Sequence, residues 1–455
     1  MSKALKYTVL TYGCQMNHSD SQRLSKALED YGYSMCEDMQ EADLVLFNTC
    51  SIKQRAEDKV LGQMNKISKL KKTRPNLLMG ITGCMTRITS TKNSEKKDKL
   101  FKTVKSLDLC FQIQDMTKLG GMLSELTPDL KDLDMQQADL KNYFQIQPKY
   151  QSDFQAYVPI MTGCDKFCTY CIVPYSRGRE ISRPIDEVYQ EVLQLVQNGC
   201  LEITLLGQNV NSYGLSWADK KQEGKFSYET APFVQLLRKL DKIEGLERLR
   251  FTSPHPQDMT NDVVDAVCEL RTLMPYIHLP LQSGNDYILR KMNRNYDKKK
   301  FKQIVDYIRE KMPDASISTD MIVGFCGETE EIHNESRDFF EDMGFDLAFI
   351  SQYSSRSGTT AGMLKKDDVS AEEKKRRFHE LNEALKRTSF ARNEYFRDKT
   401  VQVLVEKQYD EGQVSGRSEH FKEVIFEGSK ELIGKIVPVK ILSAQEWRLM
   451  GELVS

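Results

Sequence analysis

Short apolar runs alternate with longer amphipathic stretches over the first 110 residues of the chain. The apolar runs predict strands, and the stretches with helical periodicity predict helices. The predicted strands are residues 7–12, 42–48 and 77–82, and the predicted helices are residues 20–31 and 53–70. Short apolar strands that alternate with helices are typical of a small parallel α/β sheet.

A second series of the same kind follows in the middle of the chain. Its predicted strands are residues 157–161, 202–206, 248–252, 276–279, 317–323 and 347–353, separated by helices such as 186–198, 232–240, 261–270 and 299–311. Six consecutive βα units predict a barrel or a partial barrel, and the chemistry of such folds lies at the carboxyl ends of the strands.

The remaining segments differ in character from both series. Residues 117–151 are polar without a clear period and predict a linker or a loosely packed extension, whereas residues 371–399 predict a charged helix. Short strands at 401–405, 413–418, 424–426 and 436–442 predict a small antiparallel β-barrel. We therefore expect an α/β multidomain protein: a sheet domain over 1–118, a linker over 119–150, a partial (β/α)6 barrel over 151–385, and a β-barrel with its leading helix over 386–455.

The composition is that of an ordinary globular protein. The 455 residues include 65 Lys and Arg against 66 Asp and Glu, so any affinity for nucleic acid must come from local basic surface. No run approaches the roughly 18 apolar residues that span a bilayer, and the amino terminus lacks the apolar run of a signal peptide. We expect a cytoplasmic protein with no membrane partner.

Eleven cysteines in a reducing compartment favour metal ligands or catalysts over disulfides. Three of them, Cys14, Cys50 and Cys84, lie just past the carboxyl ends of the first three predicted strands. Ligands of open α/β sheets bind at that edge. The sequence therefore predicts that these three side chains converge on one point.

Three further cysteines form a CxxxCxxC motif after the first barrel strand, in the sequence GCDKFCTYC at residues 163–171. A 4Fe-4S cluster needs four ligands, and this loop offers three. One iron would stay open as a Lewis acid for the amine and carboxylate of a small molecule. Two alternatives stay open here: a zinc site, which usually uses four ligands in two pairs, and three buried thiols without metal.

The extended motif GCDKFCTYCIVPYSRGREISRP at residues 163–184 resembles the radical S-adenosylmethionine methylthiotransferases. The stretches LGQNVNSYG, MPYIHLPLQSGN and DMIVGFCGET, at 206–214, 274–285 and 320–329, resemble the tRNA branch, although Cys326 stands where that family usually has proline. The resemblance runs from YGCQMN at 12–17 to GRSE at 416–419. It is strongest to the tRNA 2-methylthio-N6-isopentenyladenosine synthases of the MiaB type.

This resemblance implies two 4Fe-4S clusters. Cys164, Cys168 and Cys171 would hold the catalytic cluster, which binds S-adenosylmethionine at its open iron and cleaves it to a 5'-deoxyadenosyl radical. Cys14, Cys50 and Cys84 would hold an auxiliary cluster, and the carboxyl-terminal barrel would be an RNA-binding TRAM module.

The implied reaction is methylthiolation of carbon 2 of N6-isopentenyladenosine at position 37 of tRNA, next to the anticodon. It would consume two equivalents of S-adenosylmethionine. The implied partners are the anticodon stem-loop, a reductant such as flavodoxin or ferredoxin, and a sulfur donor.

Polar residues after other barrel strands are candidate cofactor contacts. Gln208, Asn209, Gln282 and Ser283 could hold the methionine and ribose parts of S-adenosylmethionine, or could serve as structural loop residues. Gly324 predicts a close approach of the backbone to adenine.

Other residues have plainer alternatives. Arg177, Arg179 and Arg183 could bind a carboxylate or an RNA phosphate, or could be solvated surface. Basic residues at 374–397 could contact phosphates, but their acidic neighbours predict an ordinary charged helix. Residues predicted to belong to the core are Cys36, Cys110, Cys200, Cys268, Cys326 and His278.

Three rival functions remain. Related methylthiotransferases act on threonylcarbamoyladenosine in tRNA or on a ribosomal-protein aspartate, but their barrel segments differ from residues 206–214 and 274–285. The third rival is a non-catalytic iron–sulfur protein that binds tRNA. Such a protein would have no use for a three-cysteine loop with an open iron.

Overall fold

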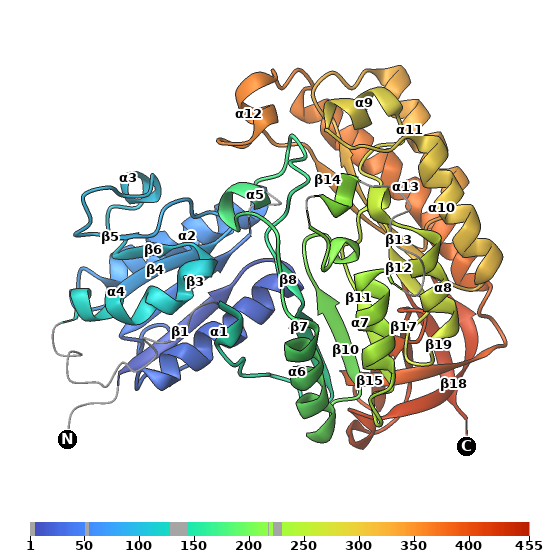
Figure 1. Ribbon diagram of the computed structural model, residues 1–455, viewed down its shortest axis with the longest axis horizontal. Helices are drawn as coiled ribbons and strands as arrows, with labels where there is room; N and C mark the ends of the chain where they lie inside the picture. The colour runs from blue at the N-terminus through green and yellow to red at the C-terminus, as the bar shows by residue number, and fades with distance from the viewer. Residues whose placement is uncertain (1–4, 51–53, 128–142, 217, 222–229, 455) are drawn as a thin grey trace. The chain divides into compact units, whose positions relative to one another are not determined.

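The computed structural model describes residues 5–50, 54–127, 143–216, 218–221 and 230–454 (Figure 1). The predictions for Lys53 and for 128–142 lie outside these residues. Contacts divide the chain into two compact units: Met1–Gln151 with Met161–Phe167 and Cys171–Arg183, and Ser152–Ile160 with Cys168–Tyr170 and Pro184–Ser455. In the described part of the chain, no helix is both long and apolar enough to cross a membrane.

The first unit is built on a six-stranded sheet in the order β2-β1-β3-β4-β6-β5, in which all pairs except β5–β6 are parallel. Its strands are β1 Lys6–Thr11, β2 Ser34–Met35, β3 Leu44–Thr49, β4 Leu78–Gly83, β5 Ser90–Thr91 and β6 Leu109–Phe111. Its helices are α1 Gln15–Asp30, α2 Gln54–Leu70, α3 Leu100–Thr103 and α4 Leu119–Leu126. The three predicted strands and the two predicted helices are confirmed, with ends shifted by a few residues.

Helices cover both faces of this sheet. Leu44 and Leu46 on β3 pack in one hydrophobic cluster with residues of α1 and α4. Val45 and Phe47 face the other way and pack in a second cluster with residues of α2. A strand that is buried on both faces needs a continuous apolar run, which is why β3 could be identified from its sequence.

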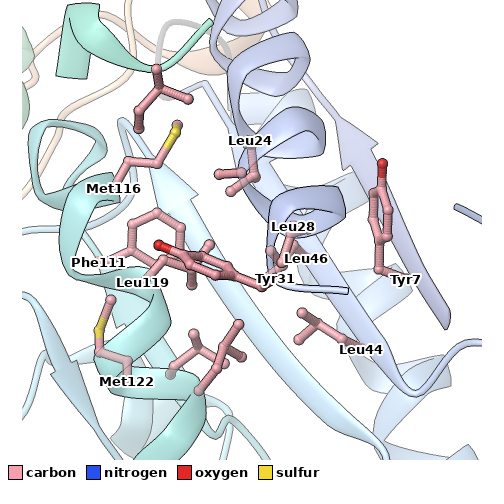
Figure 2. Packing of buried hydrophobic residues seen from close by; sticks show 14 of the residues in the cluster. Tyr7, Leu24, Leu28, Tyr31, Leu44, Leu46, Phe111, Met116, Leu119 and Met122 are labelled. Atoms are coloured by element: carbon pink, nitrogen blue, oxygen red, sulfur yellow. The ribbon is translucent and has the colours of Figure 1, made fainter. Parts of the chain in front are cut away.

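Helix α4 corrects the prediction of a loosely packed linker from residue 117 onward. Leu119, Met122 and Leu123 are buried against Phe111 and the α1 side of the sheet, as Figure 2 shows for the first two. The sequence LGGMLSEL is short and contains two glycines, so neither periodicity nor helix propensity predicts this helix. Packing against the sheet stabilises it instead.

The second unit contains six strands of a partial barrel, and every described pair among them is parallel. The strands are β7 Gln155–Pro159, β10 Glu202–Leu206, β11 Arg248–Phe251, β12 Tyr276–His278, β13 Ser316–Val323 and β14 Leu347–Gln352. A single bridge between Leu249 and Leu273 continues the sheet from β11 toward β12. The predicted partial barrel is confirmed.

Helices follow the strands of this partial barrel in sequence. They are α6 Ile185–Gln197, α7 Pro232–Asp241, α8 Asn261–Glu269, α9 Asp286–Lys291, α10 Lys298–Lys311, α11 Glu330–Met343, α12 Thr360–Leu364 and α13 Ala371–Glu394. On α13, Arg376 pairs with Glu373 and Glu380 of the same helix and with Glu330 of α11. The prediction of an ordinary charged helix is therefore confirmed for this segment.

The carboxyl-terminal segment forms a closed barrel in the order β15-β16-β17-β19-β18. Its strands are β15 Thr400–Asp410, β16 Gln413–Ser418, β17 Glu423–Glu427, β18 Ile436–Ala444 and β19 Leu449–Leu453. The predicted barrel is confirmed, with two additions. Strand β19 was not predicted, and it pairs in parallel with β17 although the other pairs are antiparallel.

Two buried arginines of β11 attach this barrel to the partial barrel. Arg248 donates hydrogen bonds to the carbonyl oxygens of Gln402 (2.6 Å) and Arg417 (2.8 Å). Arg250 donates to the carbonyl oxygen of Ser418 at 2.9 Å. The Ser418 side chain is itself fully buried and accepts a hydrogen bond from the Lys422 amide. The GRSE motif therefore joins the two barrels, and its serine faces the interior.

Asp346, just before β14, is a second attachment point. Its carboxylate lies 2.7 Å from the Lys422 ammonium, 3.2 Å from Arg309 and 3.4 Å from Arg392. Burial opposes ionisation of Asp346, but the positive charges of Lys422, Arg392 and Arg309 hold its pKa below the usual value. One carboxylate thus balances three cations, one of which belongs to the carboxyl-terminal barrel.

We expect Asp346→Asn to lower the free energy of unfolding at pH 7 by about 3 kcal/mol, because the buried Lys422 and the half-buried Arg309 and Arg392 lose the counter-charge that they share. Since the folded-state pKa of Asp346 is lowered, its contribution is present above the unfolded pKa and disappears as the pH falls through the folded pKa. Urea denaturation followed by circular dichroism at several pH values measures both effects.

Asp306→Asn is the matched control, because Asp306 forms an exposed pair with Lys302 on α10. It should change the free energy of unfolding by less than about 1 kcal/mol. Equal stability of the two variants at pH 7 would show that the Asp346 network does not stabilise the fold.

Candidate functional site

The first unit brings the predicted cysteines Cys14, Cys50 and Cys84 to one edge of its sheet. Strands β1, β3 and β4 are neighbours, and their register pairs Thr11 with Asn48 and Thr49 with Gly83. Cys50 and Cys84 directly follow their strands, and Cys14 precedes α1 as its N-cap. Because parallel strands end at the same edge, the three cysteines leave the sheet side by side.

Two asparagines connect the backbones that carry these cysteines. The Asn17 side chain donates hydrogen bonds to Asn48 Oδ1 (3.0 Å) and to the Thr49 carbonyl oxygen (3.1 Å). Its own oxygen accepts from the Cys14 amide at 3.3 Å. The Thr49 carbonyl oxygen also accepts from the Cys84 amide at 2.7 Å. Neither Asn17 nor Asn48 was predicted from the sequence as a site residue, although Asn17 ends the YGCQMN motif.

Glycines before two of the cysteines allow this close approach. A Cβ atom at Gly13 would lie 2.1 Å from Asn17 Oδ1 and 2.9 Å from the Cβ of Cys50. At Gly83, where φ is +90°, a Cβ atom would lie 2.3 Å from the Thr49 carbonyl oxygen. A larger residue at either position would collide with the segments that carry these cysteines.

A buried arginine, Arg177, lies near this edge of the sheet. Cys14 is exposed as a residue, yet the desolvation of its sulfur raises the pKa of its thiol, and the nearby Arg177 guanidinium opposes that rise. Arg177 is buried and forms an ion pair with the buried Asp20 of α1. Burial disfavours its charge, but Asp20 and then Cys84 raise the pKa of Arg177 above its usual value. A permanent cation therefore lies within electrostatic range of two predicted ligands.

The other arginines after the CxxxCxxC motif differ from Arg177. Arg183 is buried, with its guanidinium 5.2 Å from the centre of the Phe144 ring. Arg179 is largely exposed and pairs with Asp165 at 2.8 Å. The solvated-surface alternative is therefore wrong for Arg177 and Arg183, whereas Arg179 lies at the surface.

Within the first unit, the base of the motif loop is closed by a short ribbon of β8 Met161–Thr162 and β9 Ile181–Ser182. Gly163 has φ +76°, and a Cβ atom there would lie 2.1 Å from the Arg179 carbonyl oxygen. The adjacent Cys164 is buried, and its amide donates to the Gly178 carbonyl oxygen at 3.2 Å. Cys171 is half-buried and precedes the short helix α5 Val173–Ser176.

The middle of the motif loop packs within the second unit. The Thr169 amide donates to the Met292 carbonyl oxygen at 3.0 Å, and the Thr169 carbonyl oxygen accepts from the Ala361 amide at 2.7 Å. Cys168 is buried, and its sulfur lies 3.5 Å from a guanidinium nitrogen of Arg294. Arg294 was not identified from the sequence, because it lies 126 residues beyond its cysteine.

These sites suit a cluster with sulfur ligands. All six predicted cysteines are thiols outside any disulfide, and thiolates are the usual ligands of iron–sulfur clusters. In the residues that the structure describes, no group of three or more Cys, His, Asp or Glu side chains is arranged to hold a single metal ion.

The loop after β10 offers acceptors for a small molecule. Among the described residues, Oε1 of Gln208 and Oδ1 of Asn209 are buried and have no hydrogen-bond partner. The amide nitrogen of Asn209 is held by Ser212 (2.5 Å) and Asp258 (2.9 Å), which fixes the orientation of its oxygen. Unpaired buried acceptors are costly unless a ligand or water supplies a donor, and the ammonium group of an amino acid is such a donor.

The other predicted cofactor contacts lie at the same ends of the barrel strands. Gln282 has φ +71°, a backbone conformation that residues other than glycine rarely adopt. A single β-bridge to Met321 pairs this residue with β13. Ser283 is buried, and its hydroxyl lies 3.4 Å from that of Ser336 on α11. At Gly324, the missing side chain leaves room for the stem of Lys374. The close approach at Gly324 is thus made by this lysine.

The residues predicted to belong to the core are mostly buried. Cys110, Cys200, Cys326 and His278 are buried, and His278 Nδ1 lies 2.8 Å from the Ser318 hydroxyl. Cys326 packs in an apolar cluster with Phe325 and Tyr353. The prediction is wrong for Cys268, which is exposed on α8, and Cys36 is half-buried.

Matches to known families identify the chain as a radical S-adenosylmethionine protein. Residues 158–340 match the Radical SAM superfamily, residues 6–108 the uncharacterized protein family UPF0004, and residues 396–454 the TRAM domain. The fold is similar to that of the radical S-adenosylmethionine methyltransferase TsrM from Kitasatospora setae, with a TM-score of 0.53 and 13% identity over 77% of this chain and 73% of that one.

Similarity to curated proteins indicates which family of radical S-adenosylmethionine proteins the chain belongs to. The chain is 39% identical to a tRNA-2-methylthio-N(6)-dimethylallyladenosine synthase from Clostridium perfringens, over 100% of this chain and 98% of the relative. It is 40% identical to the synthase of the same name from Thermoanaerobacter pseudethanolicus, over 99% and 93% of the two chains. The chain belongs to the family of tRNA-2-methylthio-N(6)-dimethylallyladenosine synthases.

We expect Gly83→Ala to reduce iron binding by the amino-terminal cysteines by more than half. The new methyl group would collide with the Thr49 carbonyl oxygen, which also accepts a hydrogen bond from the Cys84 amide. The test measures iron and sulfide in a full-length chain whose Cys164, Cys168 and Cys171 are alanine. Only the amino-terminal cysteines can then hold a cluster.

Gly62→Ala is the matched control, since a Cβ atom at Gly62 meets nothing within 4 Å. The same chemical change on helix α2 should leave the iron content unchanged and favour the helix by about 1 kcal/mol. An iron content equal in both variants would show that Gly83 is not needed for the convergence of the thiols.

Proposed function

We propose that this chain methylthiolates carbon 2 of N6-isopentenyladenosine at position 37 of tRNA. The observation that carries the proposal is full-length identity of 39–40% to synthases of that name, in a chain that has two separate sets of three thiols. Two sets suit a reaction that needs both a radical source and a carrier for sulfur. The carboxyl-terminal TRAM match supports tRNA as the substrate.

Cys164, Cys168 and Cys171 would hold one 4Fe-4S cluster, and Cys14, Cys50 and Cys84 the other. When bound, the first supplies the electron that cleaves S-adenosylmethionine, and the second carries the sulfur to be methylated and transferred. The protein residues orient these groups and exclude water. Asn17 and Asn48 hold the amino-terminal loops together, and the absence of a side chain at Gly163 allows the base of the motif loop to close.

The side-chain oxygens of Gln208 (Oε1) and Asn209 (Oδ1) would accept hydrogen bonds from the ammonium group of S-adenosylmethionine. Both oxygens are buried without a partner among the described residues, so the donor would remove an existing penalty. Gln282, Ser283 and Gly324 lie at the same ends of the strands and would line the remainder of the cofactor site.

The reaction would also need partners that supply electrons and sulfur. A low-potential reductant such as flavodoxin or ferredoxin and a sulfur donor would complete the reaction, in the cytoplasm. Family matches at 6–108, 158–340 and 396–454 support a sheet domain, a partial barrel (151–385) and a TRAM-like barrel with its leading helix (386–455). The sheet domain continues beyond residue 118, because α4 packs on its sheet.

We expect the anaerobically reconstituted protein to convert N6-isopentenyladenosine in tRNA to its 2-methylthio derivative. The assay digests the tRNA and quantifies both nucleosides by mass spectrometry, with threonylcarbamoyladenosine-containing tRNA as the alternative substrate. Cys168→Ala should lose at least a hundredfold in rate and in cleavage of S-adenosylmethionine, while Cys268→Ala, at an exposed thiol outside both sets, should retain activity. Turnover of the alternative substrate alone would contradict the proposal.

We expect about eight irons per chain in the reconstituted protein and about four in the Cys14→Ala/Cys50→Ala/Cys84→Ala variant, from two four-iron clusters with separate ligands. Cleavage of S-adenosylmethionine should persist in that variant, while methylthiolation is lost. About four irons in both proteins would mean that the amino-terminal cysteines hold no cluster.

A further inference from the structure

Arg294 is buried in the second unit and directs its guanidinium group at a cysteine of the motif. One terminal nitrogen, Nη1, lies 3.5 Å from Cys168 Sγ, within hydrogen-bond distance of a sulfur acceptor. The other, Nη2, donates to the Pro280 carbonyl oxygen at 2.8 Å, and Nε donates to the Tyr296 hydroxyl at 2.8 Å. The three contacts fix the direction of the planar group.

Tyr296 is itself held in place. It is buried, and its hydroxyl lies 3.1 Å from the Pro280 and 2.9 Å from the Leu281 carbonyl oxygen. Pro280 and Leu281 follow β12 and lead directly into Gln282. Arg294 therefore connects Cys168 to the loop that carries the predicted cofactor contacts at the end of β12.

The charge of Arg294 has no carboxylate partner in the described part of the chain. Its contacts there are a carbonyl oxygen, a hydroxyl and the Cys168 sulfur. Two other buried arginines differ, since Arg177 pairs with Asp20 and Arg250 with Glu202. A buried cation is costly without a counter-charge, and an anionic cluster ligand at Cys168 would provide one.

We propose that Arg294 is a positioning residue that donates a hydrogen bond to the Cys168 ligand sulfur and raises the reduction potential of the cluster held by the motif. This inference rests on the proposed function, because it requires a cluster at Cys168. Reduction adds one electron from an external low-potential reductant and makes the cluster more negative. A positive donor at the sulfur stabilises the reduced form more than the oxidised form, as hydrogen bonds to cluster sulfurs do.

The test is a redox titration of the full-length Cys14→Ala/Cys50→Ala/Cys84→Ala variant without S-adenosylmethionine, followed by electron paramagnetic resonance of the reduced cluster. In that background only the motif cluster can titrate. Arg294→Met should lower the equilibrium constant for one-electron reduction about tenfold, a negative shift of about 59 mV in midpoint potential. Arg294→Lys should shift the potential less, because it keeps the charge but loses the planar donor group.

Arg250→Met is the matched control, because Arg250 is equally buried but binds the carboxyl-terminal barrel. It should leave the midpoint potential unchanged. An Arg294→Met potential equal to that of the control would overturn the inference, while leaving the proposed function intact. The absence of any cluster signal in the parent variant would instead count against the proposed function.

Tyr296→Phe covers the case in which Arg294→Met does not retain a cluster. It removes the hydroxyl that accepts the Nε hydrogen and keeps both the charge and most of the packing volume. We expect a smaller negative shift than for Arg294→Met and a changed resonance line shape. Unchanged potentials in both Tyr296→Phe and Arg294→Lys would overturn the inference.

Discussion

Parallel strand pairing is the constraint on which both candidate centres depend. In a parallel sheet every strand ends at the same edge, so loops that are far apart in sequence meet there. The register of β1, β3 and β4 brings Cys14, Cys50 and Cys84 to one edge in the first unit. In the second unit the same geometry gathers Gln208, Asn209 and Gln282 at the carboxyl ends of the barrel strands.

Buried charge organises the opposite ends of those strands. Glu202 and Asp346 each neutralise cations that hold the carboxyl-terminal barrel in place, and arginine side chains bind its backbone carbonyl groups directly. These ion pairs are satisfied within the protein. They therefore attach the carboxyl-terminal barrel to the partial barrel. Arg294 is the contrasting case, because its described partners include no carboxylate.

The motif loop shows how local geometry limits the choice of residues. Gly163 and Gly83 both have positive φ, and both lie where a side chain would meet a backbone oxygen. Each precedes a predicted cluster cysteine. Glycine at these two positions thus permits the sharp turn by which the chain enters Cys84 and Cys164.

The sequence alone determined most of the strands, both thiol sets and the order of the folded segments. Apolar runs and cysteine spacing are local signals that need no knowledge of long-range contacts. Only the tertiary structure decided that α4 packs on the sheet, that Ser418 faces inward, and that Cys268 is exposed. It also decided the partners of Arg177 and Arg294. The physical reason is that such contacts join residues separated by as many as 168 positions, and their energy depends on burial that no local pattern encodes.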